Sequence, residues 1–156
     1  MFYLLNTSAN LLANVLSLAV YLLGAYAIFK IAKIRFIPHA CMAFIPVFNL
    51  YMVGQIIDSL KYNHYKINRY ISDIPMAYAL PILSIATNFI YKLPLIGGLA
   101  STLISIVLLV AEVVMYYFVF SLYGEPKKEI PFTVLSAIVP LAGPILVLYV
   151  LKDRRY

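Results

Sequence analysis

The residue best placed to do chemistry is Glu112, the only charged side chain in the long apolar run from 93 to 123. An ionised carboxylate inside a bilayer is costly, so such residues usually face the interior of a helix bundle or a water-filled cavity. Ser105 lies seven residues before Glu112 and Tyr116 lies four after it, so all three share one helical face with Ser101. The spacing therefore predicts a polar stripe along this helix.

A polar stripe of this kind suits two roles. It can line a path for a proton or cation, with the Glu112 carboxyl as the binding group. Alternatively, Glu112 can be protonated and hydrogen-bonded to a neighbouring helix, which would fix helix packing or an oligomer contact. The spacing fits both interpretations.

Two asparagines are the other polar groups expected within apolar segments. Asn49 follows Pro46 by three residues, so its amide can bond a carbonyl that the proline leaves without a partner. Contact with a ligand is the alternative role for Asn49. Asn88 falls within another apolar run. Both are candidates, with Glu112, for a pathway or a buried polar contact.

Sequence signals for catalysis, metals and nucleic acid are missing. The chain has no Gly-x-Ser-x-Gly, His-Glu-x-x-His or phosphate-binding motif, so we expect neither an enzyme nor a cofactor. His39 and Cys41 are close, but no further cysteine or suitably placed histidine completes a metal site. The excess of 12 Lys and Arg over 6 Asp and Glu is typical of loops that orient a membrane protein, so we expect no nucleic-acid partner.

The elements that must position these residues are membrane helices. The chain is 64% hydrophobic and 12% charged, against roughly 45–50% and 25% in soluble domains. Its apolar runs are continuous, and in lipid a helix satisfies its own backbone hydrogen bonds. We therefore expect an all-α, polytopic helix bundle forming one transmembrane domain over residues 1–156. The first run is too long for a cleavable signal and lacks a basic start, so we expect it to remain as an anchor.

Five hydrophobic segments are expected to span the membrane, and two of them are broken. Pro46 breaks the second, and Pro140, Gly143 and Pro144 break the last. Four spans with a re-entrant second segment are the alternative. The five-span arrangement with the N-terminus outside puts seven Lys and Arg in cytoplasmic loops and five outside, a weak bias. The segments are approximately 9–31, 37–57, 74–91, 95–123 and 130–151, with a polar stretch at 58–73 expected as an interfacial helix or a solvated loop.

The two broken segments resemble one another. Ile37–Val53 and Ile130–Leu151 both begin with Ile-Pro, reach a second proline within about ten residues and end near Leu-Tyr. Three crossings would separate the copies, so a duplication predicts an inverted repeat, which is a recurring design of transporters. The alternative is that Ile-Pro simply opens each helix, because proline suits the first helical position.

The region around the second segment, KIAKIRFIPHACMAFIPVFNLYMVG, resembles a group of small bacterial membrane proteins of unknown function. Their pattern is a lysine-containing turn followed by Ala-x-Ile-Pro-x-x-Asn-Leu-Tyr. The resemblance covers about a sixth of the chain, and the tryptophans common in that group are absent. It implies a multi-pass protein of a bacterial cytoplasmic membrane and brings no activity. The matching residues are Ala43, Ile45, Pro46, Asn49, Leu50 and Tyr51.

These observations lead to three functional hypotheses. The first is passage of a small solute or ion through an oligomer, with Glu112 on the pathway. The second is a non-transporting accessory, immunity or assembly protein that binds a membrane partner through the same polar contacts. The third is lipid handling by the surface at 58–73. We expect contact with membrane lipid, and either a homo-oligomer or a larger membrane complex.

Overall fold

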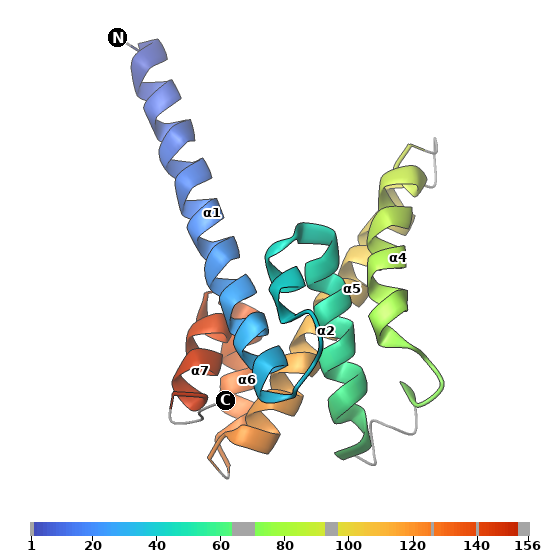
Figure 1. Cartoon of the computed structure of the whole chain (residues 1–156). Helices are drawn as coiled ribbons and strands as arrows, with labels where there is room; N and C mark the ends of the chain where they lie inside the picture. The colour runs from blue at the N-terminus through green and yellow to red at the C-terminus, as the bar shows by residue number, and fades with distance from the viewer. Residues whose placement is uncertain (1, 64–70, 93–96, 126, 140, 153–156) are drawn as a thin grey trace.

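The fold is all-α (Figure 1). The computed structural model describes residues 2–63, 71–92, 97–125, 127–139 and 141–152, with side chains from residue 13 onward. Within these ranges there are six α-helices, two short 3-10 helices and no strand. The elements are α1 (Phe2–Ile34), η1 (Ala40–Phe44), α2 (Pro46–Leu60), η2 (Lys61–Asn63), α4 (Met76–Ile90), α5 (Gly97–Tyr123), α6 (Glu129–Ile138) and α7 (Ala142–Val150).

Helix α1 is longer than the sequence predicts, since it begins at Phe2 rather than near residue 9. Its C-terminus is closed by two backbone hydrogen bonds, from Ile37 N–H to the Ala32 carbonyl and from Phe36 N–H to the Lys33 carbonyl. This is the Schellman pattern, which requires a left-handed residue after the helix. Phe36 occupies that position with φ 55°, although glycine usually takes it.

The second expected span, 37–57, is not a continuous helix. After α1 the chain passes through η1 and an extended Ile45 before α2 begins at Pro46, where proline is well tolerated. The two ends of this segment lie together, because Arg35 Nη2 donates to the Ser59 carbonyl at 2.7 Å. Residues 35–60 therefore form a broken hairpin that leaves the end of α1 and returns to it (Figure 1).

The last expected span, 130–151, is also divided. Helix α6 ends at Ile138, Val139 is extended, and α7 starts at Ala142 with Gly143 and Pro144 in its first turn. Pro140 lies outside the described residues. The end of α5 and the end of α7 face a common hollow, lined from one side by Tyr123 and from the other by Lys152. The segment after α5 is thus a second broken hairpin.

The two broken segments enter the fold from the same end, so the expected inverted relation is wrong for the described residues. Figure 1 shows α1 and α5 running in the same direction and α4 running in the opposite direction. Each long helix is followed by its hairpin, and α7 packs against α1 where Gly24 faces Pro144. The two similar sequences therefore lie in two helix-plus-hairpin units that run in the same direction.

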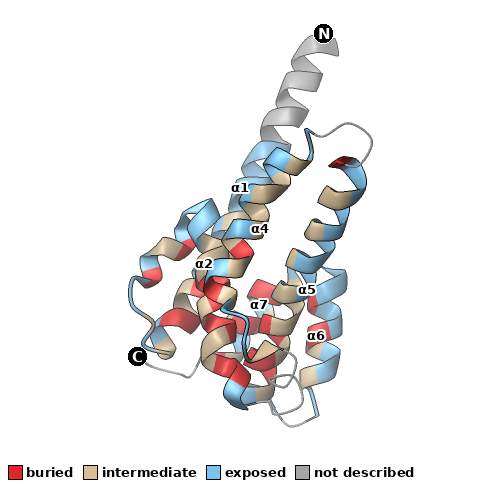
Figure 2. Ribbon diagram, turned by 90° about the vertical axis from the view of Figure 1, so that its right-hand side faces the viewer, coloured by how far each residue is buried: buried red, intermediate tan, exposed pale blue. Residues whose placement is uncertain are grey.

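Among the described residues, two helices are long and apolar enough to cross a bilayer, Ala13–Ile34 of α1 and the whole of α5. Helix α4 has 15 residues and is shorter than a usual span. Figure 2 shows buried residues gathered where the hairpins meet the long helices, while the far parts of α4 and α5 are largely exposed.

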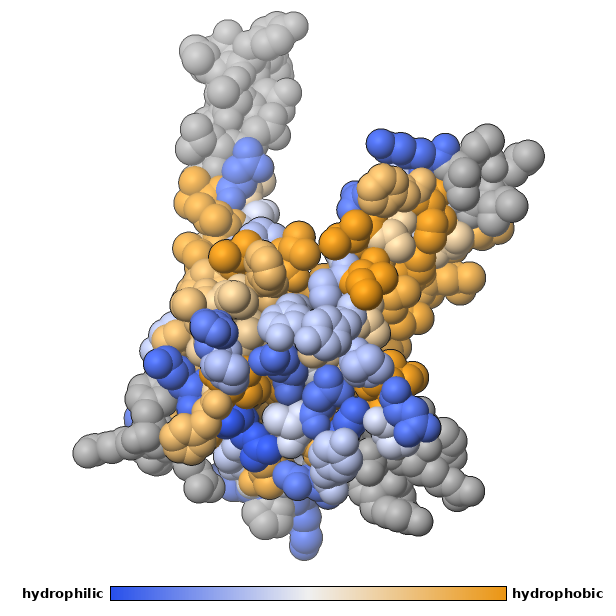
Figure 3. All heavy atoms as spheres, turned by 45° about the vertical axis from the view of Figure 1, so that its right-hand side comes forward, coloured by the Kyte–Doolittle hydropathy of each residue, from blue (hydrophilic) through white to orange (hydrophobic). Residues whose placement is uncertain are grey.

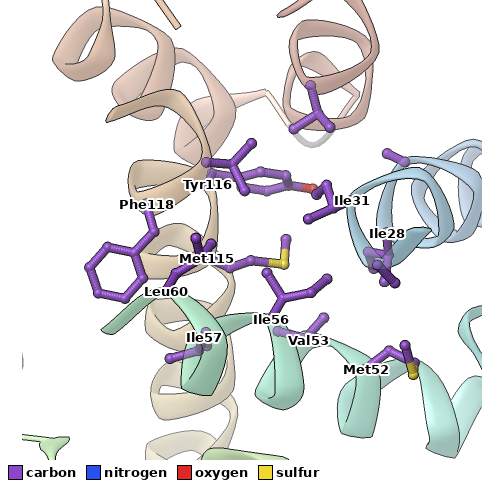
Figure 4. Packing of buried hydrophobic residues seen from close by; sticks show 14 of the residues in the cluster. Ile28, Ile31, Met52, Val53, Ile56, Ile57, Leu60, Met115, Tyr116 and Phe118 are labelled. Atoms are coloured by element: carbon purple, nitrogen blue, oxygen red, sulfur yellow. The ribbon is translucent and has the colours of Figure 1, made fainter. Parts of the chain in front are cut away.

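The core forms between α1, α2 and α5 (Figure 4). Ile31 of α1, Ile56 of α2 and Met115 of α5 are each completely buried there. Gly54 allows α2 to approach the start of α4, since a Cβ at this position would lie 2.6 Å from the Ala77 Cα. The core therefore holds the first hairpin firmly against α4 and α5.

Most of the charged side chains lie at one end of the fold, which we call the basic end and define as the end where α1, α2, α5 and α7 terminate. Figure 3 shows hydrophilic residues gathered there. It shows mostly hydrophobic residues on the two arms of the molecule, which are α1 and the pair of helices α4 and α5. Lys92, after α4, lies at the opposite end. The other described cations lie at the basic end: Lys30, Lys33, Arg35, Lys61, Lys127, Lys128 and Lys152.

Candidate functional site

Glu112 lies on the outer surface of α5, and Tyr116 beside it is buried. The Tyr116 hydroxyl donates to Glu112 Oε1 at 3.0 Å, which is the contact expected of residues four apart on a helix. Glu112 precedes Tyr123 by 11 residues, so it lies about 17 Å along the helix from the basic end. The carboxyl group therefore lies deep along an otherwise apolar helix, at its outer face.

Helix α7 of the second hairpin packs against Tyr116 of this pair. A Cβ at Gly143 would come within 2.6 Å of the Tyr116 ring, so only glycine lets α7 pack this closely. Tyr116 also stacks on Phe120, with ring centroids 6.1 Å apart. The tyrosine is thus held rigidly, and its hydroxyl fixes the position of Glu112.

The hollow next to Glu112 is small. It has a volume of about 80 Å³ and lies between α5 and α6. Leu109, Val113 and Ala137 supply most of its wall, and the polar Ser136 hydroxyl is already used in donating to the Phe132 carbonyl. The Glu112 carboxyl therefore faces a shallow, largely apolar recess at the surface of the molecule.

The remaining members of the predicted polar stripe bond to their own helix. Ser101 donates to the Gly98 carbonyl at 3.0 Å, and Ser105 donates to the Ser101 carbonyl at 2.9 Å. Ser105 is exposed and lies on the same helix as Glu112. Asn88 lies on α4, where it is exposed and donates to the Ser84 carbonyl at 3.2 Å. Asn88 is not among the residues that line the hollow beside Glu112.

Asn49 has a structural contact in the first hairpin. Its side-chain amide donates to the Ala43 carbonyl at 2.7 Å, across the break that precedes Pro46. This bond ties η1 to the first turn of α2 and satisfies a carbonyl that the break leaves outside regular helix. The residue therefore stabilises the turn of the hairpin.

The sequence reasoning missed an ion pair at the basic end. Lys61 is 5% exposed, and its ammonium donates to Asp58 Oδ1 at 3.0 Å and to the carbonyls of Ser72 and Ile74. Asp58 also accepts the backbone N–H of Ala77 at 3.0 Å, in the first turn of α4. The spacing of Asp58 and Lys61 is visible in the sequence, but their meeting with α4 is a tertiary contact.

A second group in the first hairpin also escaped prediction. Gln55 donates to the Tyr51 hydroxyl at 2.7 Å, while its Oε1 is buried and has no hydrogen-bond partner among the described residues. Both residues line a hollow of about 210 Å³ together with His39. In the described residues no three His, Cys, Asp or Glu side chains lie close enough to hold a metal ion, and Cys41 is exposed.

Comparison of the chain with protein-family models, with curated proteins and with solved structures gave no match. The functional argument therefore depends on the geometry of the chain itself.

Proposed function

We propose that this chain is an integral protein of a bacterial cytoplasmic membrane in which α1, α4 and α5 cross the bilayer and both broken hairpins are re-entrant. The hairpins would enter from the basic end and return to it. The hydrogen bond from Arg35 to the Ser59 carbonyl supports the first return, and the shared hollow of Tyr123 and Lys152 supports the second. The apolar surfaces of the two arms would then face lipid.

The distribution of basic residues supports this arrangement. Lys and Arg gather on the cytoplasmic side of membrane proteins, whereas acidic residues contribute little to orientation. With re-entrant hairpins, seven of the eight described cations fall on one side, and Lys92 is the exception. Five spans divide the same eight residues five to three. The basic end is therefore the cytoplasmic side in this proposal, and the N-terminus is outside.

The activity that the geometry favours is binding of a membrane partner, so the protein acts as a non-transporting accessory or assembly protein. The observation that carries this proposal is the Glu112 carboxyl on the outer face of α5, with the Tyr116 hydroxyl as its partner. A carboxyl at this depth needs a further polar or cationic group. The described cations of this chain lie at the ends of helices, so we assign the partner a transmembrane helix with a basic residue at the depth of Glu112.

A conduction pathway has less support. It would need a hydrated cavity reaching Glu112, whereas the recess there is about 80 Å³ and its wall is mainly apolar. The inverted relation typical of many transporters is replaced by two units that run in the same direction. The buried residues around Met115 and Ile56 pack as a dry core.

Photo-crosslinking in native membranes tests the proposal. A photoreactive residue at Leu109, one turn from Glu112 and 57% exposed, should give one discrete adduct with another protein. The matched control is Leu16 on α1, which is 64% exposed and should give no such adduct. Glu112→Gln should abolish the Leu109 adduct. A basic residue in place of Glu112, combined with an acidic residue in place of the partner's basic residue, should restore it.

Three results would overturn the proposal. The first is an adduct unaffected by Glu112→Gln. The second is an adduct with twice the mass of the 17.6 kDa chain, which would identify a second copy as the occupant. The third is ion or proton flux through liposomes of the purified protein that Glu112→Gln abolishes, which would establish conduction instead.

A further inference from the structure

A wholly apolar groove lies between α4 and α5, on a different face of α5 from Glu112. It has a volume of about 250 Å³, and every residue that lines it is apolar. Ile57 of α2 is buried and forms its floor. Its walls are formed by Ala79, Leu80 and Leu83 of α4 and by Val107, Val110 and Ala111 of α5.

One end of the groove lies toward the basic end, and its side is open. Ile71 and Ile74 line it where the polar stretch joins α4, and the Lys61 ammonium bonds to the Ile74 carbonyl at that point. Val107 and Val110 are half exposed, so the side of the groove opens to the surroundings of α5. A ligand in the groove would thus have an apolar body and a polar head near the basic end.

We propose that this groove binds one acyl chain of an anionic phospholipid from the leaflet at the basic end. The inference rests on the membrane placement proposed above and not on the partner-binding activity. The volume lies just below the roughly 300–1,000 Å³ of pockets for drug-sized ligands, so it suits one slender chain. The lining offers no hydrogen-bonding side chain, and burial of each methylene contributes about 0.8 kcal/mol.

The charge of the basic end selects the head group. The seven described cations at the basic end outnumber the four described carboxylates there (Asp58, Asp73, Glu125 and Glu129), and a basic membrane face attracts anionic lipids from the cytoplasmic leaflet. The small side chains of Ala79 and Ala111 leave the space that the chain occupies. A larger residue at either position would fill the groove from one wall.

The absence of tryptophan from the sequence allows a direct test. Val110→Trp places a single fluorophore at the groove, and Leu109→Trp places one at the matched depth on the other face, where exposure is 57% against 51% at Val110. Each purified variant is reconstituted in phosphatidylcholine vesicles containing increasing amounts of phosphatidylglycerol with brominated acyl chains. Bromine quenches tryptophan on contact, so the curves report which lipid occupies each face.

We expect half-maximal quenching of Val110→Trp at a several-fold lower fraction of brominated lipid than for Leu109→Trp. Adding Ala111→Phe to Val110→Trp should remove the difference, and Ala79→Leu should do the same from the α4 side if the first variant does not fold. Identical curves for Val110→Trp and Leu109→Trp would overturn the groove while leaving membrane insertion intact. No quenching of either variant would instead contradict the membrane placement itself.

Discussion

The ion pair at the basic end gives the most quantitative prediction for stability. Asp58→Asn removes the negative charge from Lys61 while leaving an oxygen that can still accept the N–H groups at the start of α4. Loss of one partner of a buried ion pair costs about 3–5 kcal/mol, because the other charge is left uncompensated. The Asp58 side chain is 26% exposed and Lys61 keeps two carbonyl partners, so we expect about 3 kcal/mol, the lower end.

The assay is unfolding of the purified protein in mixed micelles, titrated with a denaturing detergent and followed by far-ultraviolet circular dichroism. A loss of about 3 kcal/mol corresponds to a change of roughly 100-fold in the unfolding equilibrium constant. Replacing both residues, with Asp58→Asn and Lys61→Met together, should recover much of the loss, because no buried charge then lacks a partner.

The chain supplies a matched control for this prediction. Glu125 and Lys128 form an ion pair with the same spacing, at 2.7 Å, but their side chains are 63% and 51% exposed. Glu125→Gln should cause no measurable change, since exposed pairs of this kind are screened by water. The reasoning is refuted if Asp58→Asn destabilises the protein no more than Glu125→Gln does, or if the double replacement costs as much as the two single losses added together.

The same unfolding assay tests the close backbone approaches. Gly54→Ala should destabilise the protein by about 1–3 kcal/mol, because the new methyl group would meet the backbone at the start of α4, whereas Gly98→Ala meets nothing within 4 Å and should cost nothing. Gly143→Ala should cost a similar 1–3 kcal/mol by displacing the Tyr116 ring; an unchanged unfolding midpoint would disprove that contact. Phe36→Gly should stabilise the end of α1 by about 1 kcal/mol, as the left-handed φ of 55° is unstrained in glycine; a loss of stability would show that the exposed ring contributes more than the backbone.

Much of the helical layout could be predicted from the sequence. The apolar runs gave the long helices, and prolines marked where the chain breaks, at Pro46 and in the first turn of α7 at Pro144. The second segment is a broken hairpin whose two ends lie together, and its re-entrant placement in the membrane is our proposal. Hydropathy could not decide between a re-entrant segment and a fifth span, because a segment that returns is as apolar as one that crosses.

The features that could not be predicted from the sequence depend on contacts between residues far apart in the chain. The return of the first hairpin is fixed by Arg35 and Ser59, which are 24 residues apart, and no local pattern shows that bond. The direction of the repeat followed from an assumed number of crossings, so it was wrong once the hairpin returned. Which face of α5 is covered was equally hidden, since apolar residues flank the predicted polar stripe on both sides and only packing puts Glu112 at the surface.

The central claim is that both ends of each broken segment lie on one side of the membrane. Single cysteines at the ends of these segments test it, after replacement of the only native cysteine by Cys41→Ser. The readout is labelling by a membrane-impermeant thiol reagent in intact and in permeabilised cells. The positions are Lys33 and Asn63 for the first hairpin, Lys128 and Lys152 for the second, and Lys92 for the opposite side.

The account predicts that Lys92→Cys is labelled in intact cells and that the other four variants are labelled only after permeabilisation. Labelling that separates Lys33→Cys from Asn63→Cys, or Lys128→Cys from Lys152→Cys, would show a segment that crosses the bilayer and would contradict the re-entrant hairpins.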